Sequence, residues 1–332
     1  MVNKELLIKM VNEKLVYVNK HPSADLFIYN YSPEVQYNKS WNEITLQTRG
    51  LILDSNMNYV ARPFPKFFNL SEHVIDEIPN ESFDVFDKVD GSLGILYWLN
   101  DKPFISTRGS FISEQAIHGT KILYDKYLNI FDKLNKNYTY LFEIIYPSNR
   151  IVINYDGLDD LILLCVIDNN TGLDLPIPDI GFPIVKKYDG ITDINILKTL
   201  ESNNKEGFVV LFKNGFRVKC KFDEYCRLHK IITMVSEVTI WENLSSGTPM
   251  LGLLEKVPDE FYSWLEKTQN ELIESFNKIL DENKLIFKEF ETRKETALYF
   301  LKQKNPSVLF NMLDGKSPDK VIWNLIKPKR LI

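Results

Sequence analysis

The pentapeptide KVDGS at 88–92 constrains the fold and the chemistry of this chain more than any other stretch. Apolar residues precede it at 83, 85 and 86 and follow it at 93–98, and this pattern predicts two strands that meet at the Asp-Gly pair. A lysine beside such a turn becomes a nucleophile only where burial or neighbouring cations favour its neutral amine. The same pattern is also typical of a plain hairpin with a surface lysine, so other polar positions must decide.

Length and composition limit the classes of protein that this sequence can encode. The length of 332 residues predicts two domains, and 44% hydrophobic with 13% aromatic residues is ample for globular cores. The net charge of −5 does not indicate nucleic-acid binding, although a local groove can still be basic. Three cysteines without C-x-x-C spacing predict reduced thiols. Charges among the first ten residues predict no signal peptide, and no apolar run reaches the ~20 residues of a membrane span. We therefore expect a protein without membrane contact in the cytoplasm, which would be that of the host cell if the source is viral. We also expect a monomer.

Strand patterns dominate up to about residue 222. Helical spacing is restricted there to 3–16 and 113–134. Besides the strands that flank 88–92, strands are predicted at 26–29, 48–54, 59–61, 104–107, 138–146, 151–154, 161–167, 208–212 and 216–222. Mostly antiparallel strands with few helices between them indicate the α+β class. After Asp223 only helices are predicted, at 223–243, 255–280, 283–304 and 317–326, which sets a domain boundary near 235.

Four polar residues stand where strand patterns favour apolar ones: Arg49, Lys66, Arg108 and Glu143. The three cations suit phosphate or carboxylate ligands. Each cation also has an ordinary explanation. Arg49 suits a surface salt bridge, Lys66 suits a packed side chain with a solvated ammonium group, and Arg108 suits a simple turn. Glu143 lies within an apolar run, where a carboxylate is costly unless it is paired or binds a ligand. If this strand lies at the edge of its sheet, the Glu143 carboxylate can instead be solvated. The sequence does not decide between a ligand-binding and a solvated carboxylate.

The segment 205–222 predicts a hairpin, because Asn-Gly at 214–215 separates two apolar runs. A two-residue loop would place Lys219 opposite Val210 and Lys221 opposite Phe208. Alternation along the strands then predicts one shared face that holds Glu206, Phe208, Val210, Lys219 and Lys221. Two lysines and a glutamate on an apolar face indicate a site for an anion and a metal ion.

In chain order the polar elements are Arg49-Gly, Lys66, K-x-D-G at 88–91, Arg108-Gly, Glu143, Glu206-Gly and Lys219-x-Lys221. This order resembles the covalent nucleotidyltransferases, which are the polynucleotide ligases and mRNA capping enzymes. The fuller strings KFFN, KVDGSL, YPSNRIVI and EGFVV, with Tyr225 after the second lysine, are most similar to the T4-like phage RNA ligase 1 family. The resemblance covers about residues 40–230, and the remainder matches only in being helical.

The resemblance implies an ATP-dependent RNA ligase that uses Mg²⁺ or Mn²⁺. Lys88 would attack the α-phosphate of ATP and become a lysine–AMP adduct. The AMP would then pass to the 5′-phosphate of one RNA end, and the 3′-hydroxyl of another end would complete the joint. Residues 1–235 would form the adenylyltransferase domain, and residues 236–332 would be a helical domain that selects the RNA.

Family roles are expected at the matching positions of this sequence. Lys219 and Lys221 would assist Lys88 in catalysis, Glu206 would hold the metal, and Glu143 would bind the ribose or share the metal. The other residues expected at the nucleotide or its phosphates are Arg49, Lys66, Phe68, Gly91, Arg108 and Phe208.

The implied partner is RNA, with nicked tRNA as one candidate and a polynucleotide kinase/phosphatase as a companion enzyme. A DNA ligase or a capping guanylyltransferase is the alternative among enzymes, but both normally add an OB-fold, and residues 236–332 have almost no strand signal. A non-enzymatic RNA-binding protein on the same scaffold is the other alternative. Such a protein would be expected to lose Lys88 or the pair Lys219 and Lys221, and all three are present.

Overall fold

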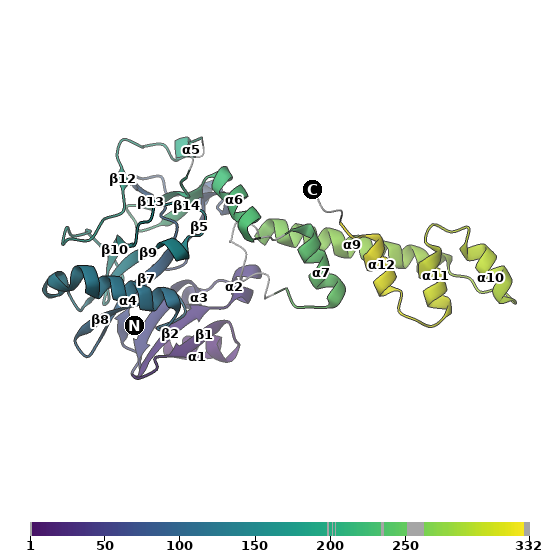
Figure 1. Ribbon diagram of the computed structural model, residues 1–332, viewed down its shortest axis with the longest axis horizontal. Coiled ribbons are helices and arrows are strands. Elements are labelled where there is room, and N and C mark those ends of the chain that lie inside the picture. Colours follow the sequence, from purple (N-terminus) through teal and green to yellow (C-terminus); the bar gives the residue numbers. More distant parts are fainter. Residues whose placement is uncertain are drawn as a thin grey trace. The chain divides into compact units, whose positions relative to one another are not determined.

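The computed structural model describes residues 2–197, 199–200, 202, 204–233, 236–250 and 262–328. The chain divides into two compact units, Met1–Ile232 and Thr233–Ile332, each of which is considered by itself. Within the described residues, the first unit contains three sheets and the second contains only helices (Figure 1). The α+β class predicted from the sequence is confirmed.

The first sheet has four antiparallel strands in chain order: β1 (Val16–Lys20), β2 (Leu26–Tyr31), β3 (Arg49–Asp54) and β4 (Tyr59–Ala61). Helix α1 (Lys4–Asn12) begins at an Asn3 N-cap and buries Leu7 and Met10 in a core with β3. Two short helices, α2 (Pro33–Tyr37) and α3 (Glu43–Gln47), connect β2 to β3. The predicted strands are present, and β1 was missed because four of its five residues are exposed.

The second sheet has the order β11 (Asp174–Leu175), β10 (Asp160–Asp168), β9 (Tyr138–Ile145), β7 (Ser92–Leu99) and β8 (Lys102–Ser106). Helix α4 (Glu114–Tyr127) covers one of its faces and continues as the 3₁₀ helix η3 (Leu128–Lys133), which confirms the helix predicted at 113–134. Fully buried Leu123 packs there with Phe142 and Ile144 of β9. β9 is an interior strand, so the edge-strand alternative for Glu143 is wrong.

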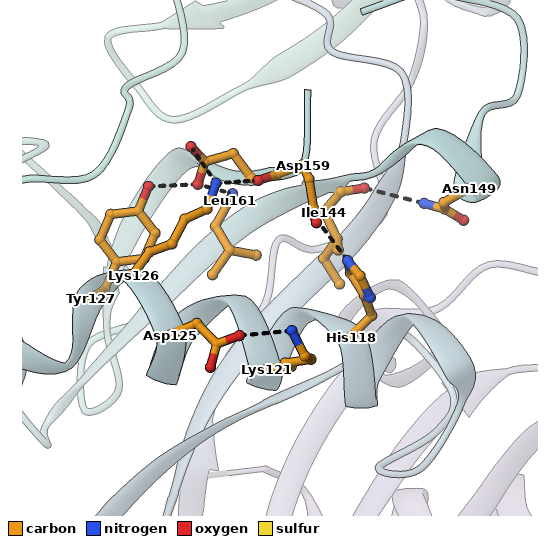
Figure 2. Close-up of polar contacts among 10 residues, drawn as sticks. His118, Lys121, Asp125, Lys126, Tyr127, Ile144, Asn149, Asp159 and Leu161 are labelled. Carbon is orange, nitrogen blue, oxygen red and sulfur yellow. Dashed lines mark hydrogen bonds and ion pairs between the residues drawn. The ribbon is translucent and has the colours of Figure 1, made fainter. Parts of the chain in front are cut away.

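Polar contacts fix α4 against the residues that lead into β10 (Figure 2). His118 Nε2 lies 2.7 Å from Asp159 Oδ1, and the Tyr127 hydroxyl donates to Asp160 Oδ1 at 2.5 Å. Lys126 Nζ donates to the Asp159 carbonyl. The helix therefore has a defined position over the sheet that carries Glu143 on its central strand.

The third sheet has the order β12 (Lys187–Tyr188), β6 (Phe83–Asp87), β13 (Gly207–Phe212), β14 (Arg217–Lys221) and β5 (Phe68–Asn69). β6 and β7, which flank KVDGS, belong to different sheets. The hairpin alternative for that segment is therefore wrong, because 88–91 is a connection between two sheets. The remaining short elements of the first unit are η1 (Leu70–Glu72), η2 (Ile75–Glu77), η4 (Pro147–Asn149) and α5 (Ile194–Leu197).

The hairpin of β13 and β14 is present, but its predicted register is wrong by one residue. Lys219 pairs with Val209, and Lys221 pairs with Gly207. The loop has three residues, since Phe212 pairs with Phe216 and Gly215 takes the left-handed conformation at φ +87°. A type I turn followed by a left-handed residue is the usual three-residue loop. One extra loop residue moves the whole partner strand to the opposite face.

Helix α6 (Asp223–Thr233) follows β14 directly, and the second unit contains α7 (Glu237–Ser246), α9 (Tyr262–Ile286), α10 (Arg293–Phe300), α11 (Pro306–Leu313) and α12 (Asp319–Leu325). Trp241 Nε1 donates to the Trp323 carbonyl at 2.8 Å, and Phe276 stacks on Trp323, so α7, α9 and α12 share a core. Residues 255–261 and the terminal cations Lys329 and Arg330 lie outside the described residues.

The helix boundaries in this part differ from the prediction. The segment 223–243 contains two helices, because Ser236 caps a new one. α9 continues through the predicted break at 281–282, and α11 was not predicted. Among the helices of the described residues, none combines the length and apolar character that a bilayer crossing requires.

Gly207 provides a stability test of the β13–β14 register. A Cβ at Gly207 would lie 2.0 Å from the Cys220 carbonyl oxygen, whereas a Cβ at Gly215 would meet nothing within 4 Å. We expect Gly207→Ala to lower the free energy of unfolding by more than ~2 kcal/mol and Gly215→Ala by only ~1 kcal/mol, the cost of a left-handed residue. Urea unfolding of both variants measures this, and equal losses would contradict the observed register.

Candidate active site

Lys88 lies at the point where β6 leaves its sheet, and two contacts define its position. Its backbone N–H donates to the Gly207 carbonyl at 2.9 Å, so the strand pairing extends one residue past β6. Its Nζ lies 2.9 Å from Glu206 Oε1, and Lys221 Nζ lies 3.0 Å from the same oxygen. Three of the predicted residues, Lys88, Glu206 and Lys221, therefore form one cluster with a single shared carboxylate oxygen.

Asp90 holds the loop that carries Lys88. Its buried carboxylate accepts N–H bonds from Val152 and Ile153 at 2.9 Å each and the Tyr225 hydroxyl hydrogen at 2.7 Å. Residues 151–154 had been predicted as a strand, and this is wrong because their N–H groups donate to a side chain instead of a neighbouring strand. The apolar pattern did not reveal Asp90 as a partner of this segment.

Gly91 permits a close approach between the loop and β9. A Cβ at this position would lie 2.7 Å from the Ile144 carbonyl oxygen and 3.1 Å from Glu143 Cγ. The Asn149 side-chain amide donates to Ser92 Oγ and to the Ile144 carbonyl at 3.1 and 3.2 Å, the latter contact being drawn in Figure 2. The K-x-D-G turn therefore rests against the strand that supplies Glu143.

Glu206 is the most buried carboxylate of the cluster, with 3% of its side chain exposed. Burial raises its pKa, but the ammonium groups of Lys88 and Lys221 outweigh burial and hold the pKa below the usual 4.5. The carboxylate is therefore ionised at neutral pH. In this arrangement Lys88 is ion-paired, so its amine must leave Glu206 before it can act as a nucleophile.

Glu143 shows the opposite shift. Burial raises its pKa to about 8, Lys88 opposes this, and the negative charges of Glu206 and Asp90 raise it further. Glu143 therefore carries a proton at neutral pH. Two carboxyl groups near one lysine thus have opposite protonation states, and a cation placed between them would favour ionisation of Glu143.

Lys88 and Glu143 open into a cavity of about 560 Å³ between the second and third sheets. Lys88, Gly91, Arg49 and Glu143 line it together with apolar side chains from both sheets: Phe86, Leu164, Ile177, Val185, Val209 and Leu211. A volume of this size with apolar walls and a few convergent polar groups is typical of a small-ligand site.

Lys66, Phe68 and Arg108 form a second cluster next to β14. Lys66 is only 7% exposed, and its Nζ lies 5.3–5.7 Å from the ring centres of Tyr31, Trp41 and Phe68. Arg108 Nη1 donates to the Tyr31 hydroxyl at 3.3 Å. Phe68 and Asn69 pair with Val218 and Lys219, which places this cluster beside the lysine strand.

Phe208 does not line the cavity, and its predicted place on the lysine face is wrong. Phe208 and Val210 lie on the opposite face of β13, buried at 5% and 0% exposure in the core of the third sheet. Val209 and Leu211 take their place, with Arg217, Lys219 and Lys221 across the hairpin. Correct counting from the three-residue loop would have identified Val209, Leu211 and Arg217.

A metal site was predicted at Glu206 and Glu143. Within the described residues, no three His, Cys, Asp or Glu side chains gather closely enough to hold a metal by themselves. Mg²⁺, however, is commonly held by one or two carboxylates together with substrate phosphates and water. The ionised Glu206 fits that kind of site, and Glu143 would join it once a cation favoured ionisation of its carboxyl group, with a phosphate ligand supplying other oxygens.

Taken together, two sheets enclose a cavity with a lysine–carboxylate cluster, and this defines an α+β protein with a built small-ligand site. Residues 47–179 match the sequence profile of the RNA ligase family, and this segment includes Arg49, Lys66, Lys88, Arg108 and Glu143. The segment is thus similar to the RNA ligase family, in line with the resemblance of the sequence motifs.

Three named relatives align with the chain. A protein of Autographa californica nuclear polyhedrosis virus, named for polynucleotide kinase and RNA ligase activities, is 29% identical over 65% of this chain and 35% of its own length. A protein of Thermovibrio ammonificans, named for RNA ligase activity, is 31% identical over 58% and 55%, respectively. The RNA ligase of Rhodothermus phage RM378 is 25% identical over 40% and 39%. The chain thus spans between about a third and about half of these relatives.

The solved structures that align with this chain do so with low sequence identity and low TM-scores. A protein of Aquifex aeolicus, named for ATP-dependent DNA ligase activity, has 15% identity and a TM-score of 0.49 over 95% of this chain and 99% of its own. An archaeal ATP-dependent RNA ligase has 15% identity and a TM-score of 0.48 over 92% and 76%. The similarity to RNA ligases therefore depends on the sequence matches.

The raised pKa of Glu143 predicts a pH-dependent stability effect. Between about pH 4.5 and 8 the folded protein holds a proton that the unfolded chain has released, so stability falls as pH rises through this window. Glu143→Gln removes that slope, by at most ~1.4 kcal/mol per pH unit. We expect the variant to gain melting temperature over the wild type as pH rises from 5 to 8, with no further gain above 8.

The matched control is Glu5→Gln, on the exposed side of α1, which removes one carboxylate away from the cavity. It should show no growing difference over the same pH range. A Glu143→Gln difference that is constant with pH would mean that Glu143 is ionised throughout.

Proposed function

We propose that this chain is an ATP-dependent RNA ligase that joins a 5′-phosphate end of RNA to a 3′-hydroxyl end. The observation that carries the proposal is the contact of Lys88 and Lys221 with one oxygen of Glu206 beside a cavity of nucleotide size. The names of the three relatives support the same reaction class.

In the first step the neutral amine of Lys88 attacks the α-phosphorus of ATP. An N–P bond forms, the bond from the α-phosphorus to the pyrophosphate oxygen breaks, and the amine loses a proton. Lys221, held 3.0 Å from Glu206, and Lys219 on the same strand face offset the charge on the phosphoryl oxygens. Arg49 on the cavity wall is placed to bind phosphate oxygens.

In the second step an oxygen of the RNA 5′-phosphate attacks the same phosphorus, the N–P bond breaks, and Lys88 recovers its proton. In the third step the 3′-hydroxyl of the other end attacks the 5′-phosphate, and AMP leaves. The hydrogen bonds of Asp90 keep the Lys88 loop in one position through these exchanges, because they anchor it to buried N–H groups.

Glu206 and Glu143 would hold a Mg²⁺ or Mn²⁺ ion. When bound, the ion supplies positive charge at the phosphates and competes with Lys88 for Glu206, which favours the neutral amine. An RNA ligase of Naegleria gruberi, at 22% identity and a TM-score of 0.37 over 47% of this chain, was solved with ATP and Mn.

The substrate and setting are also part of the proposal. RNA is the expected partner, a nicked tRNA is one form of it, and the kinase activity in the name of the viral relative suggests a companion kinase. We expect a monomer that acts in the cytoplasm. Within the described residues, 236–332 form helices without strands, which disfavours the OB-fold that a DNA ligase or capping enzyme normally adds.

Lys88→Ala and Lys88→Arg should both abolish the covalent AMP adduct, because arginine stays protonated and cannot act as a nucleophile. Lys221→Ala should reduce adduct formation by at least ~10-fold, since one charge-assisted contact to the phosphoryl group is worth about 1.5–3 kcal/mol. A denaturing gel after incubation with labelled ATP measures both effects. Lys102→Ala on β8, with an exposed side chain, is the control. Wild-type labelling of Lys88→Arg would remove Lys88 from the mechanism.

The helical unit is expected to select structured RNA. A truncation after α6, at Thr233, should still form the AMP adduct, because every residue assigned to the chemistry precedes it. Its sealing of a nicked tRNA loop should fall far more than its sealing of a flexible single strand, which needs no shaped surface. Both substrates are compared at one salt concentration, because phosphate contacts depend strongly on salt. Equal losses on the two RNAs would assign the unit to general affinity or folding.

A further inference from the structure

The ion pair of Arg217 and Asp174 crosses the cavity and has no part in the reaction described above. Arg217 Nη2, on β14, donates to Asp174 Oδ2 on β11, so the pair links the third sheet to the second. The guanidinium carbon lies 4.5 Å from the ring centre of Phe64 and 5.7 Å from that of Phe67. The side chain of Arg217 is only 9% exposed, and that of Asp174 is 29% exposed. Both line the cavity.

The pair lies at the opposite end of the cavity from Lys88. Arg217 precedes Lys221 by four residues on β14, which corresponds to ~13 Å along the strand. On the facing sheet, Glu143 pairs with Ile162 and Asp174 with Ile167, five residues apart on β10, or ~16 Å. The two strands therefore give similar separations of ~13 and ~16 Å, comparable to the length of an extended nucleoside monophosphate.

Charge distinguishes the two ends. Near Lys88 the cations Lys221 and Arg49 suit phosphates. At the other end the Arg217–Asp174 pair and the neighbouring ion pair of Lys187 with Asp84 carry no net charge. Leu175 follows Asp174 on β11 and Leu211 pairs with Arg217, and both line the cavity. A neutral planar ligand with a polar edge fits such a place, because apolar walls contact its faces and the ion pair offers a hydrogen-bond acceptor beside a donor.

We propose that Asp174 and Arg217 read the polar edge of the purine and select adenine over guanine. Asp174 accepts from the exocyclic amine, and a guanidinium N–H of Arg217 donates to the neighbouring ring nitrogen. Guanine in the same orientation turns a carbonyl oxygen toward the carboxylate and an N–H toward the guanidinium. Both contacts are repulsive, and repulsion is an effective source of specificity. This inference rests on the proposed use of ATP.

The test is a thermodynamic cycle that combines a substitution in the protein with a chemical modification of the ligand. Dissociation constants are measured for ATP and for N6,N6-dimethyl-ATP, which lacks the amine donors, with the wild type and with Asp174→Ala. Asp101→Ala removes a carboxylate from an exposed ion pair with Lys136 and serves as the control. Arg217→Lys keeps the charge next to Asp174 while removing the planar donor fork, so it provides a second variant that retains the ion pair.

We expect dimethylation to weaken binding at least ~10-fold in the wild type and Asp101→Ala, but less than about twofold in Asp174→Ala. Arg217→Lys should reduce the preference for ATP over GTP by at least ~5-fold. Equal losses on dimethylation in the wild type and Asp174→Ala, together with an unchanged ATP to GTP ratio in Arg217→Lys, would overturn this inference alone. Absence of both ATP binding and the AMP adduct in the wild type would overturn the proposed function and this inference with it.

Discussion

The active cluster depends on one buried carboxylate oxygen that two lysines share. Glu206 brings Lys88 from the end of β6 and Lys221 from the end of β14 to within 3.0 Å of the same atom. A buried carboxylate without partners would be costly, so the lysines stabilise Glu206 as much as Glu206 positions them. The rest of the first unit supports this contact. The Gly207 carbonyl holds the Lys88 backbone, Asp90 anchors its loop, and Gly91 brings Glu143 close.

The two carboxyl groups near Lys88 differ in protonation. Glu206 is ionised beside two ammonium groups, while burial keeps Glu143 protonated. A divalent cation with a nucleotide would change both conditions, because it adds charge at Glu206 and favours ionised Glu143. Lys88 would then act as an amine only when the substrate complex is assembled.

Sequence reasoning was accurate where patterns are local and failed where a single residue sets a register. Lys88, Glu206 and Lys221 could be predicted as one group because motif order carries that information. The position of Phe208 could not be predicted, since a loop of three residues instead of two moves every side chain of β13 to the other face. The link between two sheets at 88–91 and the role of Asp90 depend on distant partners such as Val152 and Tyr225, which strand patterns do not reveal.

The central claim is that Lys88 is the residue that receives AMP. The most direct measurement is mass spectrometry of the full-length protein after incubation with ATP and Mg²⁺, followed by proteolysis under conditions that preserve a phosphoramidate. The account predicts one AMP on the peptide that contains Lys88, with Lys219 and Lys221 unmodified. An adduct on Lys221, on Lys66 or on any other lysine, with Lys88 unmodified, would contradict it.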